Sequence, residues 1–105
     1  MPDIDQYRKA WSKFATGVSV ILSKDQEGVV HGMAANGITS VSLDPMLVLV
    51  CVDHSRNTYK RIKETGRFSI NILNQSQTKV AEYYARRPEK RIGNPPCDLV
   101  FGENG

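Results

Sequence analysis

The sequence predicts an α+β fold, mainly β, in which short strands form a small barrel and helices pack on its ends and side. Short β-branched and apolar runs bounded by Gly, Pro or Asp alternate irregularly with amphipathic segments, unlike the regular alternation of a doubly wound sheet. No GxGxxG follows any of these runs. With 105 residues, 40% of them hydrophobic, the chain is predicted to form a single domain over 1–105.

An amphipathic helix is predicted first, over residues 3–15. Asp3 can cap its start and Gln6, three positions later, can complete a capping box. Gly17 is expected to end it. The apolar residues that recur at spacings of three and four are Ile4, Tyr7, Trp11 and Phe14.

Four extended segments follow this helix. Residues 18–23 and 29–35 are predicted to form a hairpin, because a polar turn with a final glycine separates two strand-like runs. Residues 38–41 form a short strand that Asp44-Pro45 closes. The unbroken apolar run at 46–52 predicts a strand that is covered on both faces.

A second helix is predicted over 55–65, with Ser55 or Asn57 as its N-cap and Gly66 as its end. Its inward-facing residues are Tyr59 and Ile62.

The last regular elements are an alternating strand at 67–73 and a helix at 76–85, which Pro88 stops. Phe68, Ile70 and Ile72 share one face of that strand. Residues 92–105 are expected to be an irregular tail. The barrel is therefore expected to be incomplete, with an unpaired edge that favours pairing between subunits.

Composition restricts the partners. The net charge of +3 and pI near 9.0 suit an anionic small molecule, and the basic residues form no long stripe for nucleic acid. The densest basic stretch, 86–91, favours a solvated surface over a phosphate clamp. Cys51 is expected to be buried and unreactive, and Cys97 exposed. Reduced cysteines, no signal peptide and no membrane-length apolar run predict a cytoplasmic protein.

Familiar catalytic patterns are absent from the sequence: there is no GxSxG, HExxH, CxxC or GxxxxGK[ST]. His31 and His54 lie near predicted turns, where a surface or hydrogen-bonded structural role is the usual one. No catalytic residue and no metal site is therefore assigned.

Two segments are suited to a ligand. Residues 32–45 combine small residues, hydroxyls and one amide, so a flat ligand can approach the backbone and N–H groups can hold a phosphate. On composition alone, a polar edge strand with a glycine bulge is the favoured alternative. Residues 53–58 join a strand to a helix N-terminus, a natural anion site whose alternative is an ordinary cap with a surface arginine.

Taken together, these residues resemble the flavin reductase-like family, whose fold is an FMN-binding split β-barrel, Greek-key-like, with flanking helices. The matching pieces occur in the family's order and cover about residues 7–90. They are 14–20 (FATGVSV), 31–36 (HGMAAN), 39–45 (TSVSLDP), 47–53 (LVLVCVD), Thr58-Tyr59, 66–73 (GRFSINIL) and Gln77 with Val80-Ala81.

The resemblance implies a flavin site with two walls. Asn36 and Thr39 would bond to the flavin, Ser40 and Ser42 would lie near its ribityl chain or phosphate, and Arg56 would be a phosphate partner. One wall would contain Met33, Ala34, Ala35, Asn36, Gly37, Ile38, Thr39, Ser40, Val41 and Ser42, and the other Cys51, Val52, Asp53, His54 and Ser55.

By the same resemblance, the expected activity is hydride transfer from NADH or NADPH to N5 of FMN or FAD. The flavin carries the chemistry, which explains why no acid–base pair is visible. A homodimer and a partner oxygenase that receives reduced flavin are also implied. The alternatives are a non-catalytic or truncated flavin-binding or structural protein and, more remotely, a basic nucleic-acid-binding module around 86–91.

The sequence departs from the family's pattern in three ways. Gly37 stands where the family usually has a small polar residue, which removes one possible hydrogen bond to the flavin, and Met46 replaces a second proline. The chain also covers only the N-terminal two-thirds of the family's domain. It is expected to be truncated, to be completed by another chain, or to complete its sheet between subunits.

Overall fold

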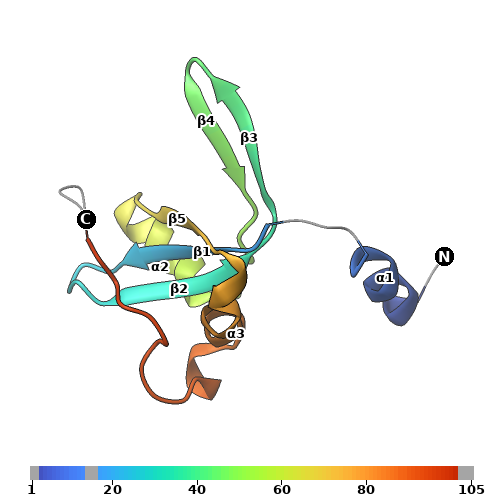
Figure 1. Ribbon diagram of the computed structural model, residues 1–105. Helices are drawn as coiled ribbons and strands as arrows, with labels where there is room; N and C mark the ends of the chain where they lie inside the picture. Colours follow the sequence, from blue (N-terminus) through green and yellow to red (C-terminus); the bar gives the residue numbers. More distant parts are fainter. Residues whose placement is uncertain (1–2, 14–16, 102–105) are drawn as a thin grey trace.

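The computed structural model describes residues 3–13 and 17–101 (Figure 1). Its helices and strands follow one another in the predicted order. They are α1 (Ile4–Trp11), β1 (Ser19–Lys24), β2 (Val30–Ala35), β3 (Ile38–Leu43), β4 (Met46–Val50), α2 (Asn57–Thr65), β5 (Ser69–Ile72), a 3₁₀ turn (Gln75–Gln77), α3 (Thr78–Ala85) and a second 3₁₀ turn (Pro88–Lys90).

The body of the molecule is a three-stranded antiparallel sheet in the order β2-β1-β5, with a helix on each face. The predicted hairpin is confirmed, since Ser19 lies opposite Ala35 and Lys24 opposite Val30. Residues directly opposite in an antiparallel pair point to the same face, so the register of β1 assigns every side chain of the sheet to one layer or the other.

One face of the sheet carries the main apolar core. Val20 of β1 packs with Val80 and Tyr84 of α3, and all three are at most 6% exposed. Half-buried residues complete this cluster: Leu22, Ala34, Leu73, Tyr83 and Cys97. Cys97 is thus packed against the core, and the prediction of an exposed thiol is wrong because the chain after α3 folds back over the sheet.

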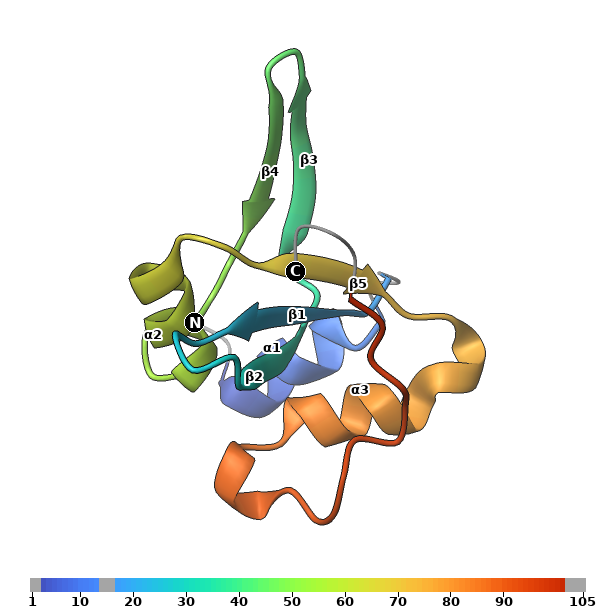
Figure 2. The ribbon, with the colours of Figure 1, turned by 90° about the vertical axis from the view of Figure 1, so that its left-hand side faces the viewer.

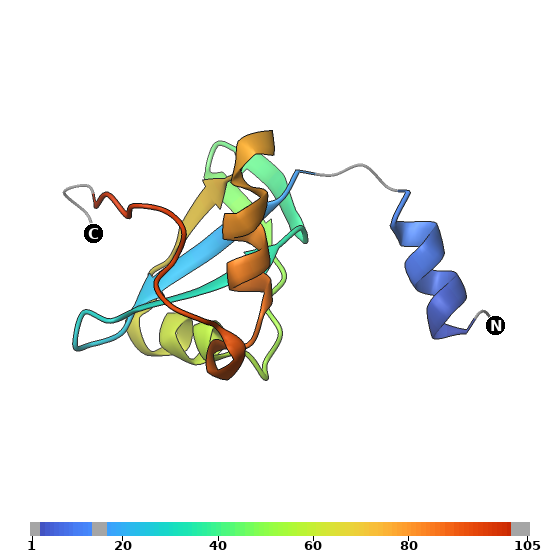
Figure 3. The same ribbon diagram turned by 60° about the horizontal axis from the view of Figure 1, so that its bottom comes forward.

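The opposite face is covered by α2. Ile21, which is fully buried, lies between Met33 of β2 and Ile70 of β5, and Thr58 of α2 is 2% exposed. Figures 2 and 3 show the resulting layers, with the sheet between the two helices. Burying apolar side chains on both faces gives this small sheet its stability.

Tight packing fixes α3 on the sheet. A Cβ atom at Gly32 would lie 2.6 Å from both Leu22 Cδ2 and Tyr84 Cε1, so no side chain fits at this position. Arg91 then ties the following segment to the same strand, since its Nη2 donates to Gly32 O at 2.7 Å. Burial lowers the pKa of Arg91, whose guanidinium also bonds to the carbonyls of Tyr83 and Tyr84.

A separate two-stranded sheet, β3-β4, projects from this body; we call residues 38–50 the arm (Figures 1 and 2). The prediction that its second strand is covered on both faces is wrong. Met46 is 84% exposed and Leu47, on the opposite face, is 53% exposed. The apolar run is sufficient to predict a strand, but burial of that strand requires other chain segments to pack against it. In the described structure, the sheet of the body lies beside the base of the arm.

The first helix also stands apart from the sheet (Figures 1 and 3). Its predicted capping box is confirmed, because Asp3 Oδ1 accepts from Gln6 N at 2.8 Å and Gln6 Oε1 accepts from Asp3 N at 3.0 Å. The helix ends at Trp11, four residues earlier than predicted, and Phe14 lies outside the described residues. Every residue of α1 is exposed, and the rings of Tyr7 and Trp11 lie 6.1 Å apart.

The second helix begins differently from the prediction. Arg56 occupies the N-cap position and makes no side-chain cap bond, so neither Ser55 nor Asn57 is the cap. Ser55 instead bonds to Asp53. Gly66 ends the helix, as predicted, and adopts the left-handed conformation with φ of 68°.

The strands do not close into a barrel, because they are divided between the body and the arm. The radius of gyration, 15.0 Å, exceeds the ~13 Å of a compact domain of this length, since both the arm and α1 extend from the body. The α+β class and its antiparallel strands are confirmed, and the described chain shows an open arrangement of them.

Candidate functional site

A cavity of about 430 Å³ lies where the arm joins the body. It is bounded by the end of β2 on one side and by the segment that follows β4 on the other. Its lining residues are Met33, Ala34, Ala35, Asn36, Gly37, Cys51, Val52 and Asp53. The structure therefore brings together parts of both sequence segments that were predicted to form a ligand site.

The two walls meet because they are the two ends of one hairpin. Ile38 lies opposite Val50 at the base of the arm, and one step further Cys51 N donates to Gly37 O at 2.8 Å. This last hydrogen bond of the hairpin places Gly37 and Cys51, fourteen positions apart in the sequence, side by side. Asn36 precedes Gly37 and Asp53 follows Cys51 by two positions, and these two residues form the polar part of the cavity's lining.

The second wall carries a negative charge. Asp53 Oδ1 accepts hydrogen bonds from the backbone N–H and the hydroxyl of Ser55, both at 2.8 Å. These bonds, followed by the positive charges of Arg56 and Arg87, lower the pKa of the Asp53 carboxyl. The carboxylate is ionised at neutral pH and holds the loop that leads into α2.

Arg56, the predicted phosphate partner, lies half-buried behind this loop. Its Nη2 donates to Tyr84 O at 3.2 Å, and Arg91 Nη2 donates to the same oxygen at 3.3 Å. Two guanidinium groups thus converge on the C-terminal end of α3, where positive charge is favourable. His54, predicted to be a surface or structural residue and, by the resemblance, part of the second wall, places its ring 4.5 Å from that of Tyr59 and is not among the cavity's lining residues.

The remaining predicted residues of the first wall lie outside the cavity. They continue along β3 into the arm, with Thr39, Ser40 and Val41 exposed. None of them lines the cavity, and the arm to which they belong extends away from the body (Figure 1). The residues involved are Ile38, Thr39, Ser40, Val41 and Ser42.

Cys51 was predicted to be buried, and this prediction is wrong. The residue is exposed and lines the cavity, because β4 ends at Val50 and the following backbone leaves the hairpin. Its thiol is therefore part of the site's surface, whereas Cys97 is half-buried in the body.

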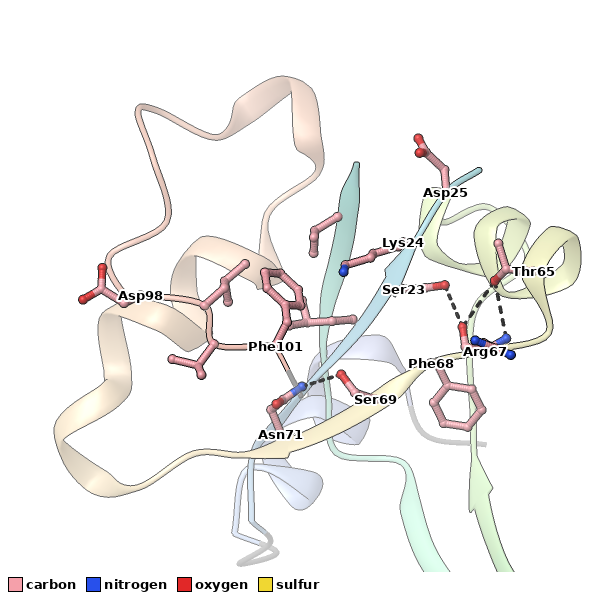
Figure 4. Close-up of a pocket in the computed structure, with 14 residues that line it drawn as sticks. Ser23, Lys24, Asp25, Thr65, Arg67, Phe68, Ser69, Asn71, Asp98 and Phe101 are labelled. Atoms are coloured by element: carbon pink, nitrogen blue, oxygen red, sulfur yellow. Dashed lines mark hydrogen bonds between the residues drawn. The ribbon is translucent and has the colours of Figure 1, made fainter. Parts of the chain in front are cut away.

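A larger cavity of about 1000 Å³ lies on the body between β1, β5 and the segment 98–101 (Figure 4). Lys24 Nζ lies 3.9 Å from the centre of the Phe101 ring, a cation–π contact that attaches this segment to the strand. Ser23 Oγ donates to Arg67 O at 2.8 Å, and Asn71 Nδ2 donates to Ser69 Oγ at 2.9 Å. Sequence analysis missed this cavity because its walls come from three distant segments without any local motif.

Within residues 3–13 and 17–101, no three His, Cys, Asp or Glu side chains are grouped to hold a metal ion. The helices in the same ranges are all too short and polar to cross a bilayer.

Comparison with known proteins identifies the family. Residues 11–103 match the family described as "Flavin reductase like domain". This chain belongs to that family. The cavity at the base of the arm is formed by Gly37 together with residues of the HGMAAN and LVLVCVD pieces, which carry the sequence resemblance.

Several flavin reductases are similar to this chain in sequence or structure. NADH-dependent flavin reductase StyB of Pseudomonas fluorescens is 38% identical over 102 residues, covering 95% of this chain and 59% of StyB. The styrene monooxygenase flavin reductase of Pseudomonas putida S12 is 33% identical with a TM-score of 0.79, covering 92% of this chain and 61% of that one.

A third similar protein has been solved with ligand fragments. It is the NADH:FAD oxidoreductase SgcE6 of Streptomyces globisporus C-1027, in complex with NAD and FAD fragments. The identity is 33% and the TM-score 0.82, over 97% of this chain and 59% of that one. The chain thus spans about three-fifths of the length of these three relatives.

Proposed function

We propose that this chain is the flavin-binding part of an NAD(P)H:flavin oxidoreductase, with FMN as its flavin. The observation that supports the proposal most directly is the cavity at the base of the arm, which both predicted flavin-binding segments line. The relatives' names, which include NADH-dependent and NADH:FAD reductases, support a nicotinamide co-substrate and leave FAD as the alternative flavin.

The residues of the cavity fit a flavin ring. Its volume of about 430 Å³ lies within the ~300–1,000 Å³ typical of small-molecule sites. Small side chains, Ala34, Ala35 and Gly37, allow a flat ring to approach the backbone, and the Asn36 amide offers both a donor and an acceptor. When bound, the flavin would supply the chemistry by accepting a hydride at N5.

The protein's own groups orient the ring and its tail in this proposal. Asn36 bonds to the polar edge of the ring, and Cys51 and Val52 form the opposing surface. Arg56 approaches the phosphate through N–H groups other than the one used on Tyr84. Thr39, with Ser40 and Ser42, would reach the flavin only if the arm folds toward the body or toward a second copy.

We also propose that reduced flavin passes to a separate oxygenase. The name of one similar protein, the styrene monooxygenase flavin reductase, supports this proposal. A homodimer is supported by the arm, whose apolar side chains are exposed on both faces. An isolated hairpin of this kind is marginally stable in water. A second copy of the chain could pack against its exposed apolar side chains and stabilise it.

Flavin titration tests the proposal. The wild-type chain should bind FMN, and Asn36→Leu should bind it about tenfold or more weakly, because a polar edge of the ring would be left unpaired. Asn94→Leu is the matched control, since Asn94 is exposed and outside the cavity's lining. Flavin fluorescence quenching gives the affinities.

Bleaching of flavin absorbance on addition of NADH or NADPH then separates a reductase from a non-catalytic flavin-binding protein. Failure of the wild-type chain to bind FMN or FAD would contradict the proposed function as a whole. Equal affinities for wild type and Asn36→Leu would contradict the assigned wall only.

A further inference from the structure

The two walls of the cavity touch at one point, formed by Gly37 and Cys51. Besides the hydrogen bond from Cys51 N to Gly37 O, the side chain of Cys51 occupies the space beside the glycine. A Cβ atom at Gly37 would lie 3.1 Å from Cys51 Cβ and 3.6 Å from Cys51 Sγ. Carbon atoms prefer a separation of about 3.5–4.0 Å, so any side chain at this position would be crowded by Cys51.

Crowding by Cys51, rather than an unfavourable backbone conformation, is what a side chain at residue 37 would meet in this chain. The described glycines with positive φ are Gly28, Gly66 and Gly93, and Gly37 is not one of them. An L-residue could therefore adopt the local backbone of Gly37, and the obstacle is the neighbouring side chain alone. The closer of the two contacts is with Cys51 Cβ, which is attached directly to the backbone and cannot rotate away.

We propose that the Gly37–Cys51 contact determines how far apart the two walls stand at the base of the arm, and thereby sets the gap that receives the flat ring of the flavin. The inference rests on the proposed function and adds to it a defined steric element. A methyl group at residue 37 requires Cys51 to give way by a few tenths of an ångström, because neither partner can relieve the contact by changing a rotamer. The shift would reach Val52 and Asp53, which line the same cavity.

This geometry makes a distinctive prediction about pairs of substitutions. Gly37→Ala should weaken FMN binding roughly tenfold, the usual effect of adding a methylene to a packed site. Adding Cys51→Gly should restore binding to nearly that of the Cys51→Gly single variant, because the crowding Cβ is removed. Adding Cys51→Ala should not restore it, because alanine keeps the Cβ atom.

Gly17→Ala is the matched control, since a Cβ atom at Gly17 meets nothing within 4 Å. Its affinity for FMN should equal that of the wild type. Far-UV circular dichroism and thermal melting establish that each variant is folded before its titration is compared with the others. Equal FMN affinity of Gly37→Ala and wild type would overturn the inference, as would equal rescue by Cys51→Ala and Cys51→Gly.

A measurement without flavin separates this inference from the proposed function. In a Cys97→Ser background, Cys51 is the chain's single thiol, and its rate of alkylation reports its surroundings. Gly37→Ala should change this rate, whereas Gly17→Ala should not. A changed rate in a protein that binds no flavin would support the steric contact and reject the proposed function, and an unchanged rate would reject the contact.

Discussion

The body and the arm contain similar strands, yet their side chains have opposite surroundings. In the body, Val20 and Ile21 are adjacent residues of β1 and both are buried, one against α3 and the other on the face covered by α2. In the arm, Val48 and Leu49 are adjacent residues of β4 and are 47% and 54% exposed. Both pairs are apolar and both belong to confirmed strands.

The difference lies in what each strand has beside it. β1 is the central strand of its sheet and has a helix on each face, whereas within residues 3–13 and 17–101 the strands β3 and β4 pair with each other in a separate two-stranded sheet. Local sequence therefore explains the strand in both regions, and the neighbouring segments explain the burial. Substitutions in the two regions should separate these contributions.

The largest effect is expected for Tyr84→Ala in the body. Tyr84 is 4% exposed, packs with Val20 and Val80 and covers Gly32, so its truncation leaves a large cavity. We expect a loss of about 3–5 kcal/mol in the free energy of unfolding, enough to unfold much of so small a domain. Urea denaturation monitored by circular dichroism measures it, and a loss below about 1 kcal/mol would contradict this packing.

A smaller, pH-dependent effect is expected at the turn between β1 and β2. His31 Nε2 lies 3.1 Å from Asp25 Oδ2, and Val29 N and Glu27 N donate to the same carboxyl group. The hydrogen bond with His31, followed by that from Val29, lowers the pKa of Asp25 below its ordinary value of 3.8.

Because the folded-state pKa is the lower one, the carboxylate's contribution to stability is present above pH 3.8 and is lost as the pH falls through the folded-state pKa. Asp25→Asn should therefore melt at a lower temperature than wild type near neutral pH, and the two proteins should converge in acid. Melting temperatures measured across the acidic range test this, and a constant difference would exclude the carboxylate's charge as the cause.

The smallest effect is expected for Leu47→Ala in the arm of the monomer. Leu47 is 53% exposed, so its truncation removes little packing, and the free energy of unfolding should change by at most about 0.5 kcal/mol. Urea denaturation at low protein concentration measures it. A loss comparable to that of Tyr84→Ala would show that the arm is covered in solution, and its dependence on protein concentration would identify a second copy as the cover.

The cavity shows the same division between local and tertiary information. Both of its walls were identifiable as segments, since small residues around Asn36 and the polar loop after Val52 are unusual beside apolar strands. Their meeting at Gly37 and Cys51 depends on the hairpin register, which fixes the last rung of the ladder. The arm extends away from the body, and Thr39 lies outside the cavity's lining.

The sequence by itself determined the order of the elements, the capping box at Asp3, the end of α2 at Gly66 and the hairpin of β1 with β2. The cap and the helix end follow from interactions within a few residues of chain, and the hairpin follows from a short turn between adjacent strands.

Only the tertiary structure decided the environment of each element. In the structure, Cys51 is exposed, Cys97 is half-buried and Arg56 is hydrogen-bonded to Tyr84. The arm stands apart from the body. The physical reason is that burial and long-range hydrogen bonds depend on segments distant in sequence, whose positions follow from packing both faces of one sheet.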